Sequence, residues 1–195
     1  MKNQTFKKQQ LFKLVLALED IERAANGLEV IGKTYNEIWA KLNGQNLTSE
    51  FEYIINALDS SVIIHYSKPF IGNKPFGTIG TNWKILKIKN NLKIHESVID
   101  LRHTSEAHSD MNKRFVYLFA DENSKYSPRF SIGQSAFDLS PLEDDLKIIC
   151  KGLISEIKYK INFLTKEIYG KRPLALHPKN GVQIDWKNEI GFKEK

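Results

Sequence analysis

The sequence predicts a mainly α-helical fold, a bundle of amphipathic helices with a small β-hairpin insert near residues 114–134. Over several long segments, apolar residues recur every three or four positions, which places them on one face of a helix. Only one short region has the character of paired strands. A chain of 195 residues fits one domain. We assign residues 1–170 to this domain and residues 171–195 to a C-terminal tail that packs on it.

The first helix is expected over residues 5–26, where Glu19 and Asp20 lie opposite the apolar face. Gly27 is expected to end this helix or to kink it. Residues 28–42 carry apolar side chains at mixed three- and four-residue spacing, so they either continue the first helix or form a second one.

The next helix is expected to begin at Thr48 or Ser49, whose hydroxyl can cap it, and to run to about Tyr66. Asp59 is the acid in the middle of this helix and is expected to face solvent. Residues 68–83 follow with five proline or glycine residues. They predict a long irregular loop.

Positive charge is concentrated around this loop. The chain has 29 basic and 23 acidic residues, which gives a net charge of +6, while residues 60–95 contain six lysines and no acid. Clustered lysines beside aromatic rings suit contacts with RNA phosphates and bases. Lys68 and Lys74 are therefore candidate RNA-binding residues. In the alternative interpretation, the lysines only solubilise the loop and its aromatic residues anchor it to the helices: Phe70, Phe76 and Trp83.

The β-hairpin is predicted from three adjoining patterns. Residues 115–120 form an apolar run of strand-forming character, and residues 121–127 are rich in turn formers. Phe130 and Ile132 then alternate with polar residues. The resulting two-stranded insert is expected to pack against the helical bundle.

The last helix is expected to start at Ser140, with Pro141 at its first helical position, and to run to about Tyr169. Gly170 closes it. A helix of about 28 residues is roughly 40 Å long. One face of it is apolar throughout: Leu146, Ile149, Cys150, Leu153, Ile157, Ile161, Leu164 and Ile168.

Titratable side chains are most concentrated in the sequence DLRHTSEAHSD, at the end of a helix predicted over residues 92–107. On a helical wheel, His108 ends the apolar face and is expected to be partly buried, whereas His95, Arg102 and Ser109 share a polar face. The guanidinium of Arg102 is long enough to reach a ligand that His108 also touches.

The imidazole of His108 and the guanidinium of Arg102 can each take part in catalysis. A partly buried imidazole can act as a general acid or base near neutral pH. A guanidinium can hold a phosphate and stabilise charge that develops on it. Together, Arg102 and His108 would suffice for metal-independent RNA cleavage, in which the 2′-hydroxyl attacks the adjacent phosphate. In the alternative interpretation, His108 only caps the helix C-terminus and Arg102 pairs with Glu106.

The motif resembles the signature of the HEPN superfamily, an arginine and a histidine separated by four to six residues. Arg102 and His108 are separated by five. The neighbouring sequences resemble those of small bacterial HEPN-like proteins. These are Ile94-His95, Ala107-His108-Ser109-Asp110 and Tyr66-Ser67-Lys68-Pro69-Phe70. The resemblance covers residues 59–110.

The resemblance implies an α-helical bundle that forms a homodimer, with both motifs facing a shared cleft. It further implies a metal-independent ribonuclease of a toxin–antitoxin or phage-defence system, with RNA as substrate and an antitoxin protein as a partner. In such an enzyme, His108 is the general acid or base and Arg102 holds the scissile phosphate. His103 stands where the family commonly has asparagine or another small polar residue. It can still donate a hydrogen bond to a phosphate, as can His95 and Ser109.

The cysteine content and the search for targeting, membrane-spanning and metal-binding patterns limit the class of protein. Cys150 is the only cysteine, which fits a reducing compartment and leaves no intrachain disulfide. We find no signal peptide, no membrane-spanning segment and no metal-ligand cluster, so we expect a cytoplasmic protein without a metal or another cofactor. Two other functions stay open. The chain is either a non-catalytic module that binds a nucleotide, nucleic acid or a partner protein, or the motif is a polar network that stabilises a dimer.

Overall fold

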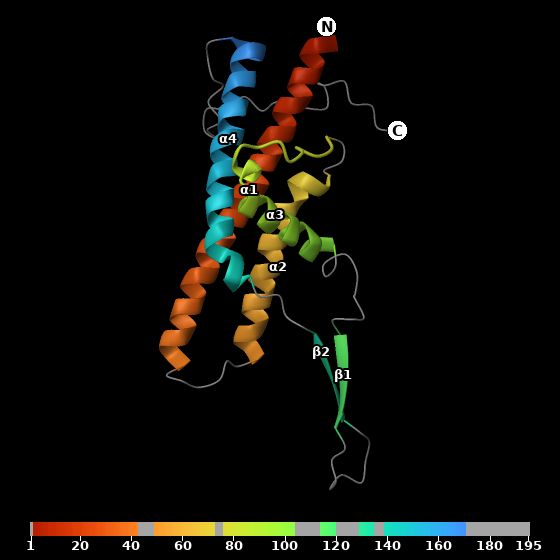
Figure 1. Cartoon of the computed structure of the whole chain (residues 1–195), viewed down its shortest axis with the longest axis vertical. Coiled ribbons are helices and arrows are strands. Elements are labelled where there is room, and N and C mark those ends of the chain that lie inside the picture. The colour runs from red at the N-terminus through yellow and green to blue at the C-terminus, as the bar shows by residue number, and fades with distance from the viewer. Residues whose placement is uncertain are drawn as a thin grey trace.

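The computed structural model describes residues 2–42, 49–72, 76–103, 114–119, 129–134 and 139–170 (Figure 1). Helices make up most of these residues, so the prediction of a mainly α-helical bundle is confirmed. The α-helices within the described ranges are α1 (Lys2–Leu42), α2 (Ser49–Ile71), α3 (Lys89–Leu101) and α4 (Glu143–Tyr169). Two short 3-10 turns, η1 (Ile85–Lys87) and η4 (Ser140–Leu142), precede α3 and α4.

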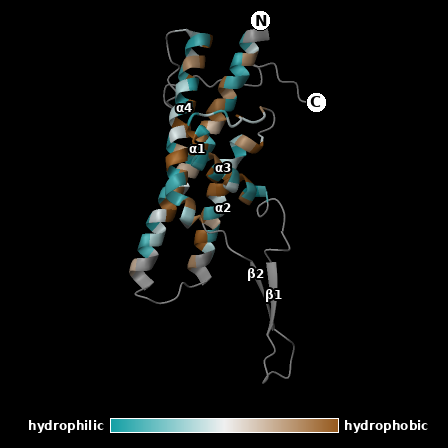
Figure 2. Cartoon of the chain, viewed as in Figure 1, coloured by the Kyte–Doolittle hydropathy of each residue, from teal (hydrophilic) through white to brown (hydrophobic). Residues whose placement is uncertain are grey.

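Helix α1 is the longest element, about 60 Å from end to end at 1.5 Å per residue. Helices α2 and α4 both pack against it, and α3 packs against α2 and α4 (Figure 1). Hydrophilic and hydrophobic residues are interspersed along the helices (Figure 2), and most of the buried hydrophobic residues form one main core. The buried apolar residues of α1 recur at helical spacing: Leu11, Leu14, Ala17, Ile21, Ala24, Leu28 and Ile31.

Gly27 neither ends nor kinks this helix, because α1 continues through it without a break. A Cβ atom at position 27 would lie 2.6 Å from Cγ2 of Val62 in α2. The glycine therefore allows α1 and α2 to approach closely where they cross. Of the two interpretations of residues 28–42, the structure shows the continuous helix.

Helix α2 begins at Ser49 as predicted but ends at Ile71, beyond the predicted end at about Tyr66. It includes Pro69, which the sequence placed in a loop. Proline is tolerated there because it removes only one hydrogen bond close to the end of the helix, and its carbonyl accepts a hydrogen bond from the backbone N–H of Ile79 at 2.9 Å. The predicted loop is correspondingly shorter.

Asp59 does not face solvent. Its side chain is buried, and the backbone N–H of Leu139, just before η4, lies 3.5 Å from its Oδ2 atom. The expectation was wrong because a single polar residue in a helix gives no signal of a neighbour 80 positions along the chain. Asp59 ties the start of the last helical segment to α2.

The loop before α3 is anchored at several points over residues 76–88. The indole N–H of Trp83 donates to the carbonyl of Gly80 at 2.9 Å, and the ring is 1% exposed. The backbone N–H groups of Lys84 and Ile85 donate to the two carboxylate oxygens of Glu156 in α4, at 2.9 and 2.8 Å. Of the two interpretations of the loop, anchoring by an aromatic residue is confirmed at Trp83.

Helix α4 follows its prediction closely. It ends at Tyr169, and Gly170 follows with φ of 82°, a left-handed conformation that glycine adopts without strain. Six of the eight predicted apolar positions are buried, and the other two pack against the core: Leu164 and Ile168. The tail predicted over residues 171–195 lies outside the described residues.

Two antiparallel strands, β1 (Arg114–Phe119) and β2 (Arg129–Gln134), pair with Arg114 opposite Gln134 and Phe119 opposite Arg129. The segments 104–113, 120–128 and 135–138 lie outside the described residues. The hairpin as an insert that packs against the bundle therefore stays a prediction.

Replacing Gly152 with alanine is expected to destabilise the fold, although alanine is the better helix former. A Cβ atom at position 152 of α4 would lie 2.6 Å from Cγ1 and 2.9 Å from Cβ of Ile85. The helix propensity gain is about 1 kcal/mol, and overpacking costs about 1–3 kcal/mol. We expect urea unfolding to show a net loss of up to about 2 kcal/mol. Ser155→Ala, at an exposed position of the same helix, is the control. A more stable Gly152→Ala protein would contradict the close approach.

Candidate functional site

The candidate site begins at the C-terminal end of α3. This helix is fixed by Ile94 and Val98, which are buried in the core. After Leu101 the chain continues in π-helical geometry at Arg102 and His103. Single π-helical turns are frequent at functional sites. Arg102 therefore directly follows a helix that is packed firmly into the core.

Arg102 itself is half-buried, and His103 is exposed. The backbone N–H of Arg102 donates to the carbonyls of Ile99 and Val98, so its main chain is held by the helix. The Arg102 side chain forms no ion pair with another residue within the described ranges. The main chain thus fixes the point from which the Arg102 side chain extends.

Three of the predicted site residues, His108, Ser109 and Lys74, lie outside the described residues, as does Glu106. The convergence of Arg102 and His108 on one phosphate therefore stays a prediction. The same holds for the alternative, in which Arg102 pairs with Glu106.

His95 lies elsewhere than predicted. Its side chain is 3% exposed, so its placement on an exposed polar face with Arg102 is wrong. The ring lies between two aromatic residues of α2: its Nδ1 is 3.0 Å from the hydroxyl of Tyr66, and its centroid is 4.5 Å from that of Phe70. In this arrangement it has almost no surface to offer to a phosphate.

Burial lowers the pKa of His95 to about 4, because the charged imidazolium loses its hydration. His95 is therefore neutral at neutral pH, and its Nδ1 shares a hydrogen bond with the Tyr66 hydroxyl. Burial also raises the pKa of Tyr66, and Cys150 adds to this shift, so the phenol keeps its proton. The pair joins α2 to α3 as a neutral contact.

The folded protein is expected to lose stability as the pH falls from about 6.5 to about 4, and His95 should account for part of the loss. In this window the unfolded chain binds a proton at His95, while the folded chain does not. Below about pH 4, proton binding at His95 in the unfolded chain lowers the free energy of unfolding by about 3 kcal/mol. Urea unfolding of the wild type and of His95→Gln across this range measures it. The variant should lose less stability, and equal losses would contradict the buried neutral ring.

Lys68 lies at the surface but is not free of a partner. Its Nζ is 3.0 Å from Oδ1 of Asp20 in α1, and Nδ1 of His65 is 3.5 Å from the same oxygen. Asp20 is 4% exposed, although the sequence analysis placed it on the polar face of its helix. Asp20 is three residues after Ala17 and four residues before Ala24. This spacing could have shown that Asp20 lies on the buried face of the helix. This carboxylate partly offsets the charge that Lys68 would offer to RNA.

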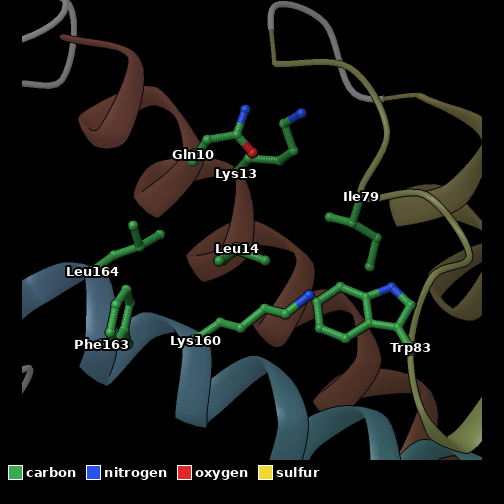
Figure 3. Close-up of a pocket in the computed structure, with 8 residues that line it drawn as sticks. All are labelled: Gln10, Lys13, Leu14, Ile79, Trp83, Lys160, Phe163 and Leu164. Carbon is green, nitrogen blue, oxygen red and sulfur yellow. The ribbon is translucent and has the colours of Figure 1, made fainter. Parts of the chain in front are cut away.

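A cavity of about 280 Å³ lies between the N-terminal part of α1, the C-terminal part of α4 and the loop before α3 (Figure 3). Its lining is mainly apolar, with two lysines and one glutamine and no acidic residue: Gln10, Lys13, Leu14, Ile79, Trp83, Lys160, Phe163 and Leu164. The sequence analysis named Trp83 but missed Lys13 and Lys160, which lie far apart in the chain. Their proximity follows only from the antiparallel packing of α1 and α4.

Comparison of the chain with known protein families, with curated protein sequences and with solved structures gives no match. Across the described ranges, no helix combines the length and the apolar character needed to cross a membrane. The same part of the chain contains no group of three or more His, Cys, Asp or Glu side chains that could hold a metal ion.

Proposed function

We propose that the protein is a metal-independent endoribonuclease of the HEPN type. The observation that carries the proposal is the Arg102-x5-His108 motif, which begins on the half-buried end of a core-packed helix. An α-helical bundle is the architecture that the resemblance to the HEPN superfamily implies. We extend the proposal to a HEPN-like bundle with a β-hairpin insert, acting as a cytoplasmic homodimer in a toxin–antitoxin or phage-defence system.

The reaction uses only groups of the RNA and of the protein. His108 takes the proton of the 2′-hydroxyl, whose oxygen then attacks the neighbouring phosphorus. The bond from phosphorus to the 5′-oxygen breaks, and that oxygen leaves with a proton from a second acid or from water. Arg102 stabilises the additional negative charge on the phosphate in the transition state. The products are a 2′,3′-cyclic phosphate and a 5′-hydroxyl.

An RNA backbone bound at Arg102 would also pass positive charge at the opposite, N-terminal end of α3. Lys84, Lys87, Lys89 and Lys93 are all exposed in η1, α3 and their connections. Such a group of lysines attracts a phosphate backbone and makes binding dependent on salt. His103, Ser109 and Lys74 stay proposed RNA contacts. Lys68 contributes less than the sequence suggested because Asp20 lies beside it.

The proposal is tested by comparing three substrates of one sequence in EDTA: RNA, 2′-O-methyl RNA and DNA. We expect cleavage of the RNA alone, because only RNA has a free 2′-hydroxyl to act as nucleophile. Cleavage of the 2′-O-methyl RNA, or activity only with an added divalent cation, would overturn this mechanism.

The second candidate is a helical module that binds RNA, a nucleotide or a partner protein without catalysis. It is favoured by the exposed lysines of η1 and α3, which can bind phosphates without a catalytic group beside them, whereas the burial of His95 and the pairing of Lys68 with Asp20 weaken two phosphate contacts under either candidate. Such a module would bind RNA with strong salt dependence and produce no cleavage. Binding without turnover in the same substrate series would identify it.

A further inference from the structure

The geometry points to a binding site for a small organic anion in the cavity between α1, α4 and the loop before α3, with Lys13 and Lys160 as its cationic groups. The ligand would combine one carboxylate, phosphate or sulfonate group with an apolar body of one or two rings. The cavity has no lining residue from α3. This site does not rest on the proposed ribonuclease activity.

The charge of the cavity selects for an anion. The ammonium of Lys13 donates to the carbonyl of Thr78 at 3.1 Å, and the ammonium of Lys160 lies 3.7 Å from the centroid of the Trp83 ring. Neither lysine forms an ion pair with a residue that the structure describes. Two lysines therefore line one cavity that has no acidic residue in its walls, and an anionic ligand would supply the missing charge.

The cavity walls select for an apolar body. Leu14 and Trp83 are buried, Ile79 and Leu164 are half-buried, and Phe163 stands exposed at the side (Figure 3). Small-molecule sites typically combine a mainly apolar lining with a few oriented polar groups. A volume of about 280 Å³ accommodates one or two rings. A bare inorganic anion would leave the apolar wall uncovered.

The site is held in shape before any ligand arrives. The Trp83 ring fixes the end of Lys160 by a cation–π contact, and its own indole N–H is bound to Gly80. Glu156 holds the backbone of Lys84 and Ile85 just after this tryptophan. Because loop and lysine are already ordered, binding costs less conformational entropy.

A pair of fluorescent probes tests the site in the full chain. Naphthalene-1-sulfonate carries the required charge on two fused rings, and 1-methylnaphthalene has the same two rings without the charge. We expect the sulfonate to bind saturably, at one molecule per chain. Lys13→Gln and Lys160→Gln should each weaken its binding about tenfold, since each removes one charged contact. The neutral probe should bind more weakly and should not respond to either substitution.

Matched controls separate this site from general surface binding. Lys151→Gln removes an exposed lysine of α4 that does not line the cavity and should leave affinity unchanged. Lys160→Arg keeps the charge and should retain binding. Ile79→Phe, which fills the cavity, should abolish binding without changing the circular dichroism spectrum. Absence of saturable binding, equal affinity for both probes, or unchanged affinity in both glutamine variants would overturn the site.

Discussion

Replacing His108 with alanine is expected to reduce RNA cleavage by about 10²–10⁴-fold, the usual contribution of a positioned general acid or base. The loss should appear in kcat, because the imidazole acts on the proton that moves in the transition state. Binding of a 2′-O-methyl RNA should change little. Single-turnover cleavage in EDTA and a binding titration measure the two effects separately.

His103→Ala is the matched control for this prediction. His103 is a neighbouring histidine and is exposed at the end of α3. We expect its replacement to weaken RNA binding and to leave most of the cleavage rate intact. If His103→Ala removed cleavage while His108→Ala did not, the roles of the two histidines would be reversed. If neither variant changed the rate, the histidines of this motif would have no part in catalysis.

Replacing Trp83 with alanine is expected to lower the free energy of unfolding by about 3–5 kcal/mol, the range for removing a large buried aromatic side chain. The ring is 1% exposed and belongs to the main core. The substitution also removes the hydrogen bond to Gly80 and the contact with Lys160. Urea unfolding measures the loss.

Two control substitutions test whether the loss of stability comes from the buried indole of Trp83. Trp83→Phe keeps an aromatic ring but not the N–H donor, so it should cost less than the alanine substitution. Tyr159→Ala removes an aromatic side chain that is 73% exposed and should change stability little. A Trp83→Ala protein as stable as the wild type would show that this tryptophan does not anchor the loop.

The helices could be predicted from the sequence because their buried faces repeat with the helical period. In α4 this pattern is uninterrupted from Leu146 to Ile161, and each of the predicted positions in that range is buried. In α1 the pattern runs through Gly27, and only the approach of Val62 explains why a glycine stands there. The local sequence predicts that a segment is helical. Whether two helices approach each other closely depends also on the residues of the neighbouring helix.

The buried polar groups could not be predicted in the same way. His95 follows Ile94 and precedes the buried Val98, so it lies at the border of the apolar stripe. Its burial depends on Tyr66 and Phe70, which α2 brings to α3 across the intervening loop. A helical wheel describes one helix, and the neighbouring helix decides which border residues are covered.

The described residues include only part of the candidate site, so its set of residues stays a prediction. Arg102 was expected at the end of a helix, and the structure places it there, half-buried. The cavity lysines, by contrast, carry no sequence signal. Lys13 and Lys160 are ordinary polar residues of two amphipathic helices until the packing of α1 against α4 brings them together.

The most direct test of a shared phosphate site is to identify the RNA ends formed in EDTA by the wild type, Arg102→Ala and His108→Ala. If Arg102 and His108 act on one phosphate, the wild type produces 2′,3′-cyclic phosphate and 5′-hydroxyl ends, and both variants produce almost none. Ends of another kind, or undiminished cyclic ends from either variant, would contradict that site.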